Sequence, residues 1–263
     1  MAKRKIGVIV DSLKLGVLDG IKKAKEIGAD GCQFYVTNGE LYPDNFAKEK
    51  RKELKKFITD LGLEITALCA DFDWIKGFTD AEFNKINIPR IKKCIDLACD
   101  LETNVVTMHI GKFPQDESHQ VYQETFRTTV ELGRYAEERS VILATETGPE
   151  DPAELKIFLN RVSSKGIGVN YDPANLVMCG PFDHIGGVEI LKDYICHTHA
   201  KDGVCLGNGK YIELPLGEGG VVFEYYLKAL DEIGYDGYLT IERESGNDRV
   251  EDVKKAVEFL KTF

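Results

Sequence analysis

The residues with the clearest chemical potential stand at the end of one stretch, residues 195–202. This stretch begins as an apolar run with β-branched residues, which predicts a strand, and it ends in histidines, a lysine and an aspartate. Because side chains alternate along a strand, His197 and His199 lie on the same face. Imidazoles and charges are costly to bury at the end of a core strand, so the stretch indicates a site.

Three carboxylates occupy corresponding positions in other segments of the chain. Glu146, Asp172 and Glu242 each stand at the end of a short apolar run, as His199 does. Carboxylates that are brought together at low dielectric repel one another strongly, and a divalent cation removes that repulsion. Oxygen-rich ligation with one imidazole suits manganese, magnesium, cobalt or zinc and does not choose among them. We therefore predict one metal ion, held by Glu146, Asp172, His199 and Glu242.

The elements that must position these residues alternate along the whole chain. Apolar runs predict eight strands, at residues 6–11, 31–36, 64–71, 105–111, 141–147, 167–173, 195–202 and 237–242. Amphipathic patterns predict helices at residues 18–27, 43–61, 90–99, 117–139, 152–162, 187–194, 223–233 and 248–261, and a glycine-containing loop is expected at 215–220. Eight such units predict an α/β fold with parallel strands: a (β/α)8 TIM barrel, as a single domain over residues 1–263.

An open doubly wound sheet is the competing architecture. That fold usually carries a glycine-rich turn after its first strand, and residues 11–16 do not match G-x-G-x-x-G. In a barrel the carboxyl ends of all strands meet at one mouth, where catalytic residues are placed. The four predicted metal ligands then lie at one level of that mouth, and His109 joins them from the fourth strand.

The composition narrows the class of protein. A chain of 263 residues with 43% hydrophobic and 30% charged residues is typical of a soluble globular domain. The net charge of −10 argues against nucleic acid as a partner. The seven cysteines form no C-x-x-C pair, so we expect reduced thiols in a cytoplasmic protein. No apolar stretch is long enough to cross a membrane, so a membrane is not an expected partner.

Each candidate residue also has a purely structural interpretation. A lone glutamate at a strand end often caps a loop or forms an ion pair, and only the conjunction on successive strands favours a site. His197 lies one pleat deeper than His199, where a hydrogen-bonded core histidine fits as well as a functional one. Trp74, in the loop after the third predicted strand, either stacks on a substrate or covers the core.

At these residues the chain resembles the sugar phosphate isomerase/epimerase family of xylose isomerase-like TIM barrels, over almost its whole length. The likeness is carried by TE at 145–146, YDPAN at 171–175, HTHAKD at 197–202, LGEG at 216–219 and TIERE at 240–244. In that family the positions matching the four predicted ligands bind one divalent metal. The positions matching Glu146 and Glu242 also face each other across the substrate as acid and base.

The resemblance implies a metal-dependent carbohydrate isomerase or epimerase that removes a proton beside a carbonyl through a metal-stabilised enediolate. Return of the proton to the same carbon gives epimerisation, and return to the neighbouring carbon gives isomerisation. On this hypothesis Glu146 and Glu242 are the catalytic acid and base, and Asp202 orients His199 or Lys201. Manganese is the first metal to test. The expected substrate contacts are His109, Asn175, Lys201 and Trp74.

Other functions stay open at this stage. Loss of a β-hydroxyl at the same site would give a dehydratase or lyase that acts on a keto-cyclitol or a 3-keto-sugar, as in inosose dehydratase. A sugar-binding barrel would not need two opposed glutamates. An endonuclease IV-like phosphodiesterase should carry more than five histidines and a basic mouth, and Asn175 replaces a histidine of several family members. The expected partner is a small carbohydrate, phosphorylated or not, and the resemblance suggests a homodimer or homotetramer.

Overall fold

A computed structural model of the protein describes residues 4–180 and 182–263. Eight parallel strands close into a barrel in the order β1-β10-β7-β6-β5-β4-β3-β2. They are β1 (Lys5–Ile9), β2 (Gly31–Tyr35), β3 (Glu64–Cys69), β4 (Val105–Met108), β5 (Ile142–Glu146), β6 (Ile167–Tyr171), β7 (Ile195–Ala200) and β10 (Tyr238–Ile241). The predicted single-domain (β/α)8 TIM barrel is therefore confirmed; of the predicted span 1–263, residues 1–3 and 181 lie outside the described residues.

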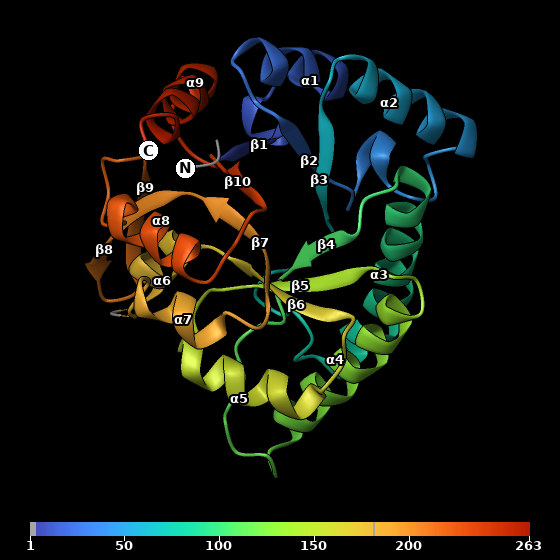
Figure 1. The fold of residues 1–263 in the computed structure, drawn as a ribbon. Coiled ribbons are helices and arrows are strands. Elements are labelled where there is room, and N and C mark those ends of the chain that lie inside the picture. The colour runs from blue at the N-terminus through green and yellow to red at the C-terminus, as the bar shows by residue number, and fades with distance from the viewer. Residues whose placement is uncertain (1–3, 181) are drawn as a thin grey trace.

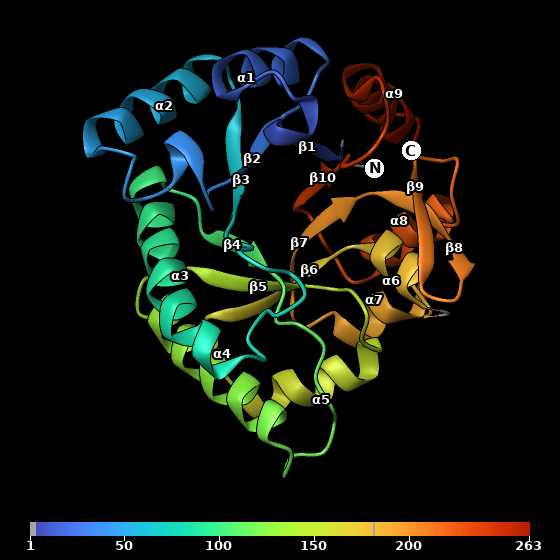
Figure 2. The same cartoon turned by 180° about the vertical axis from the view of Figure 1, so that it is seen from behind.

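Helices surround the strands on the outside of the barrel (Figures 1 and 2). They are α1 (Val17–Glu26), α2 (Lys48–Asp60), α3 (Ala81–Leu101), α4 (Gln120–Glu137), α5 (Pro152–Val162), α6 (Pro173–Cys179), α7 (Gly186–Leu191), α8 (Phe223–Glu232) and α9 (Arg249–Leu260). Short 3-10 turns follow β1 and β2, at Val10–Leu13 and Gly39–Leu41. The strands are buried almost throughout because the helices cover them, as expected for parallel strands.

Two helices differ most from the prediction. Helix α3 begins at Ala81, well before the predicted start at residue 90, because the Asp80 carboxylate caps it by accepting bonds from the backbone N–H groups of Glu82 and Phe83. Pro89 lies inside this helix, where a proline removes a backbone donor. Helix α6 was not predicted; it follows β6 directly, with Asp172 as its N-cap and Pro173 in its first turn.

A hairpin also departs from the prediction. The antiparallel strands β8 (Asp202–Gly207) and β9 (Lys210–Leu214) follow β7, where the sequence indicated only the end of a strand and a loop. The barrel strands themselves end slightly earlier than predicted, so Asp172 and Glu242 lie just beyond β6 and β10. These side chains therefore stand at the mouth of the barrel and not within its wall.

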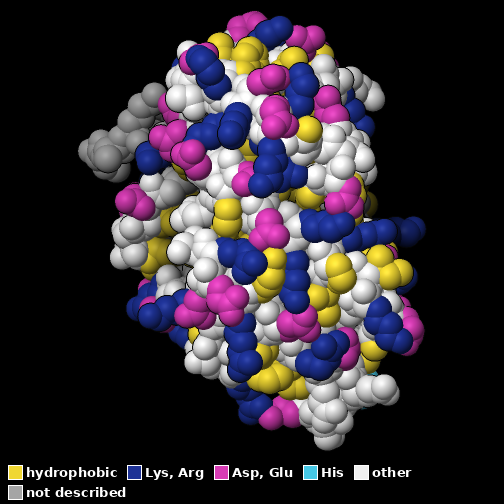
Figure 3. Space-filling view, turned by 90° about the vertical axis from the view of Figure 1, so that its right-hand side faces the viewer, with side chains coloured by type: hydrophobic (Ala, Val, Ile, Leu, Met, Phe, Trp, Pro, Cys, Tyr) yellow, Lys and Arg dark blue, Asp and Glu magenta, His cyan; other side chains and the backbone are white. Residues whose placement is uncertain are grey.

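The outer surface carries both signs of charge. Figure 3 shows basic and acidic side chains interspersed over one side of the molecule. Pairs spaced four residues apart, such as Lys56 and Asp60 in α2, are of the kind that stabilises exposed helices slightly. None of the helices that the structure describes combines the length and the apolar character that a bilayer-spanning segment needs.

Candidate active site

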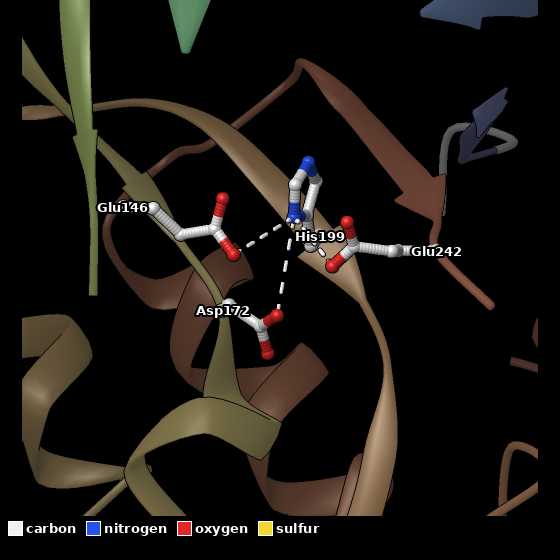
Figure 4. Close-up of side chains that lie close together, drawn as sticks. All are labelled: Glu146, Asp172, His199 and Glu242. Carbon is white, nitrogen blue, oxygen red and sulfur yellow. Dashed lines mark ion pairs between the residues drawn. The ribbon is translucent and has the colours of Figure 1, made fainter. Parts of the chain in front are cut away.

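The structure brings the four predicted metal ligands together at the mouth of the barrel. Glu146 ends β5, His199 lies on β7, and Asp172 and Glu242 directly follow β6 and β10. One ligand atom of each residue lies within 4.8 Å of the corresponding atoms of the others, and all four residues are buried. The His199 Nδ1 atom is 3.3 Å from Glu146 Oε1, 3.3 Å from Glu242 Oε2 and 3.9 Å from Asp172 Oδ2. Figure 4 shows the two glutamates approaching the imidazole from opposite sides.

The two carboxylate oxygens of Asp172 have different roles: one caps a helix and the other faces the cluster. Its Oδ1 atom accepts bonds from the backbone N–H groups of Ala174, at 2.8 Å, and Asn175, at 3.2 Å, as the cap of α6. Its Oδ2 atom is buried and has no hydrogen-bond partner among the described residues. Burial raises the pKa of Asp172, and the nearby charge of Glu146 raises it further. A carboxylate oxygen left without a donor beside two other carboxylates fits a bound divalent cation.

The orientation of His199 also fits a metal ligand. Its Nε2–H group donates to the Gln33 Oε1 atom at 3.1 Å, and Gln33 in turn donates to the Thr107 hydroxyl at 2.9 Å. Because a carbonyl oxygen only accepts, Nδ1 is left to face the carboxylates, which is the usual arrangement of a metal-binding imidazole. Burial alone would lower the pKa of His199, but Glu146 and Glu242 raise it well above its ordinary value, so a proton occupies this nitrogen when no cation does.

Asn170 and His197 support the cluster from below. The Asn170 amide donates to Glu146 Oε2 at 3.1 Å, and its oxygen accepts a bond from His197 Nδ1 at 2.8 Å. The Nε2 atom of His197 accepts from the Thr240 hydroxyl at 3.1 Å. Burial, with the nearby charge of His199, holds the pKa of His197 well below its ordinary value. His197 is therefore a neutral, hydrogen-bonded core residue.

Lys201 and Tyr35 also contact the Glu242 carboxylate, Lys201 at the oxygen that faces His199 and Tyr35 at the other oxygen. The Lys201 Nζ atom lies 3.0 Å from Glu242 Oε2 and also bonds Glu244, while the Tyr35 hydroxyl donates to Glu242 Oε1 at 3.1 Å. Burial alone would raise the pKa of Glu242, but Lys201 and His199 hold it well below its ordinary value. Burial opposes the charge of Lys201 as well, yet Glu242 and Asp172 raise its pKa well above the ordinary value. Both groups are therefore charged.

A cavity of about 300 Å³ opens onto this cluster. It lies at the small end of the range for small-molecule sites. The His109 Nδ1 atom is 2.5 Å from Asp71 Oδ2, and its Nε2 atom is 3.9 Å from Glu146 Oε1. Burial would lower the pKa of His109, but Glu146 and Asp71 raise it to about 9. Trp74 is 55% exposed at the rim, and its ring lies 6.4 Å from that of His109. The cavity lining contains all the predicted substrate contacts: Trp74, His109, Asn175 and Lys201.

One predicted role needs correction, and another residue has an additional role that was not predicted. Asp202 does not orient His199 or Lys201, because its carboxylate accepts backbone N–H bonds from Gly203, Gly217, Gly219 and Val221 and so holds the 215–221 loop in place. The Asn175 amide group donates to Glu146 Oε1 at 2.9 Å and to the Thr147 carbonyl at 3.1 Å. Asn175 therefore positions a ligand carboxylate, and its oxygen remains the atom that can accept a bond from a substrate hydroxyl.

Sequence reasoning did not identify several residues that shape the site. Gln33 and Asn170 are amides inside otherwise apolar strands, and this interruption is a signal that could have marked them. Asp71 ends a predicted strand beside the tryptophan loop, so its position also was informative. Tyr35 and Glu244 had no comparable signal. Their partners, Glu242 and Lys201, lie far from them in the sequence, and neither contact was predicted.

The sequence and the fold are similar to those of known proteins. A model of the xylose isomerase-like TIM barrel family matches residues 21–263. Over 191 residues the chain is 29% identical to the uncharacterized protein MJ1311 of Methanocaldococcus jannaschii, a match that covers 68% of this chain and 62% of that relative's own length.

Two solved structures share the whole architecture. A xylose isomerase domain protein from Planctomyces limnophilus is 26% identical, with a TM-score of 0.86, over 99% of this chain and 95% of that one. A D-tagatose 3-epimerase-like protein is also 26% identical, with a TM-score of 0.78, over 98% of this chain and 97% of that one. On the family match to residues 21–263, the chain belongs to the xylose isomerase-like TIM barrel family.

Proposed function

We propose that this protein is a divalent-metal-dependent epimerase or isomerase that acts on a sugar or keto-sugar by moving a proton at a carbon beside a carbonyl. The observation that carries the proposal is the placement of Glu146 and Glu242 on opposite sides of one buried cluster of candidate metal ligands, where both side chains line the same cavity. The likeness to a D-tagatose 3-epimerase-like protein over nearly the full length of both chains supports the same chemistry.

The residues divide the work of proton transfer. Glu146 and Glu242 are placed so that one removes a proton from one face of a bound substrate and the other returns a proton on the opposite face. His109 and Lys201 carry positive charge at the cavity wall and are placed to donate to substrate oxygens as negative charge develops there. A divalent cation held by Glu146, Asp172, His199 and Glu242 would add positive charge beside those same oxygens. Asn170 and Asn175 hold Glu146 in position.

The direct test is proton exchange. The protein, loaded with manganese and in parallel with magnesium, cobalt or zinc, is incubated in heavy water with a panel of ketoses, keto-sugars and inososes. We expect deuterium at the carbon beside the carbonyl together with an epimer or isomer, detected by NMR and mass spectrometry. The variants E146Q and E242Q should lose this exchange by about 10²–10⁴-fold, with metal content measured for each.

The matched control is E232Q, which removes an exposed carboxylate of α8 that does not line the cavity, and this variant should catalyse exchange at the normal rate. Loss of water from the product would identify a dehydratase instead. No carbon-bound exchange with any member of the panel, in metal-loaded protein, would overturn the proposal.

A further inference from the structure

The charges around the cavity restrict which sugars it can admit. The lining carries two basic side chains, His109 and Lys201, and six carboxylates: Asp71, Asp73, Glu146, Glu213, Glu242 and Glu244. Of these carboxylates, Glu213 is neutralised by the buried Arg243 behind it. His109 is already paired with Asp71. A bound divalent cation would offset only part of the charge of its own ligands, so the excess of negative charge remains around the space where a substrate would lie.

Lys201, the cation placed deepest in this lining, is shared between two carboxylates. Its Nζ atom contacts Glu242 on one side and Glu244 on the other. The Lys201 side chain is 6% exposed, whereas that of Glu244 is 57% exposed. Glu244 therefore lies on the solvent side of the lysine, and a substrate group that approaches Lys201 from the mouth meets this carboxylate.

Glu244 is held in this position by its backbone. Its N–H group donates to Glu213 Oε1 at 3.0 Å, and its carbonyl accepts a bond from Arg249. Glu213 is itself fixed by the buried Arg243, at 2.8 Å. Because the segment is tied at both its N–H and its carbonyl, the carboxylate cannot leave Lys201 by a shift of the backbone without breaking these bonds.

We propose, resting on the function proposed above, that the site takes an uncharged sugar or keto-sugar and excludes phosphorylated or carboxylated ones, and that Glu244 enforces this choice. A phosphate that reached Lys201 would have to displace Glu244 or lie beside it, and like charges at that distance repel. Hydroxyl groups face no such conflict, because they donate to carboxylates and accept from Lys201.

The neighbouring cavity does not supply an excess of basic side chains that could bind a phosphate or carboxylate group of the substrate. It has a volume of about 530 Å³ and shares Tyr35, Glu242 and Glu244 with the first. Its arginines donate to protein acceptors: Arg243 to Glu213 and Asp252, and Arg249 to backbone carbonyls. Lys14 is the remaining basic residue of this lining, and it faces four carboxylates there: Asp11, Glu40, Glu242 and Glu244.

The test compares each sugar with its own phosphate ester on metal-loaded protein. D-tagatose with D-tagatose 6-phosphate, and D-fructose with D-fructose 6-phosphate, are measured by calorimetric binding and by proton exchange. We expect the wild-type protein to favour the neutral member of a pair by at least about tenfold. The variants E244Q and E244A should reduce the ratio of the affinity for the neutral sugar to the affinity for its phosphate ester by about tenfold or more. The reason is that Lys201 becomes available to the phosphate. The control E40Q removes a carboxylate from the neighbouring cavity and should leave the ratio unchanged.

The outcomes separate this inference from the proposed function. Tighter binding of a phosphate ester by the wild-type protein overturns the inference, even when proton exchange supports the epimerase or isomerase. An unchanged ratio in E244Q and E244A, in protein with normal thermal stability, overturns the role of Glu244. Neutral sugars that bind selectively without any proton exchange would support the charge selection and count against the proposed chemistry.

Discussion

Gln33 sets which nitrogen of His199 faces the carboxylates. Its oxygen accepts the Nε2–H bond at 3.1 Å, and its own amide is fixed by Thr107. The imidazole is thus held in one tautomer and one orientation before any cation arrives. Residues behind a metal ligand commonly contribute 10–100-fold to metal affinity, although they never touch the ion.

We therefore expect Q33L to weaken manganese binding by about 10–100-fold, because His199 loses the acceptor that fixes its tautomer. Calorimetric titration of metal-free protein with manganese measures this directly. The matched control is T107V, which removes the far end of the same hydrogen-bond chain but leaves the Gln33–His199 contact in place, and we expect a smaller effect. Equal affinities for wild type and Q33L would show that Gln33 does not support the metal site.

At the scale of residues, the sequence predicted the four candidate ligands that the structure brings together, but it did not predict the residues that support them. Glu146, Asp172, His199 and Glu242 were predictable because each ends an apolar run and the strand ends of a barrel share one mouth. Gln33 was not, because its role depends on a partner 166 positions away across a closed barrel. Asp202 was assigned wrongly for the same reason: its true partners are backbone groups of a loop whose path the sequence does not reveal.

At the scale of elements, one carboxylate fixes the loop that follows the hairpin. Asp202 accepts four backbone N–H bonds, from Gly203, Gly217, Gly219 and Val221, at distances of 2.8 to 3.0 Å. A side chain at Gly219 would collide with it, since a Cβ atom there would lie 2.1 Å from Asp202 Oδ1. The loop is therefore built around this carboxylate.

Replacement of Asp202 should loosen the 215–221 loop and destabilise the protein. We expect D202A to lower the free energy of unfolding by about 2–4 kcal/mol, because several buried N–H groups lose their acceptor. Denaturant unfolding gives the magnitude, and hydrogen exchange should accelerate at the amides of Gly217, Gly219 and Val221. In the control D183A, an exposed aspartate loses bonds from only Ile185 and Gly186, and we expect a cost of about 1 kcal/mol or less. Equal losses in the two variants would contradict this account.

The order of the elements was predictable and their boundaries were less so. Alternation of apolar strands with amphipathic helices gave all eight barrel strands, because burial on both faces leaves a continuous apolar run. Helix α3 was predicted too short, since Pro89 lies inside it and the cap at Asp80 stands well before that proline. The β8–β9 hairpin was not expected, because Tyr211 and Ile212 remain exposed and the segment lacks a buried face to mark it.

At the scale of the whole molecule, a metal bound by the four candidate ligands would couple its binding to folding. Three carboxylates and an imidazole are buried together, and in the metal-free protein protons must satisfy them. The pKa of His199 is raised well above its ordinary value of 6.5, so protonation of His199 favours the folded state at low pH and this benefit is lost as the pH rises through the raised pKa. The raised pKa of Asp172 acts in the same direction.

Metal binding displaces these protons, so the stabilisation by manganese should grow with pH. We expect the increase in melting temperature on saturation with manganese to be larger at pH 8 than at pH 6. Displacement of one proton per ion corresponds to about tenfold in affinity for each pH unit. Scanning calorimetry with and without manganese measures the difference. The variant H199A should show little manganese-dependent shift at either pH, and an effect independent of pH in the wild type would contradict proton displacement.

The candidate metal ligands and many of the cavity-wall residues come from different strands of the barrel. All four come from β5, β6, β7 and β10, which are neighbours in the closed sheet, whereas β2, β3 and β4 and the loops after them supply cavity walls such as Tyr35, Phe72, Trp74 and His109. One arc of the barrel therefore carries the four candidate metal ligands, and the opposite arc supplies much of the cavity wall, with Gln33 of that opposite arc bonded to His199. Changes in the loops after β2, β3 and β4 could therefore alter which substrate fits the cavity without disturbing the four candidate ligands.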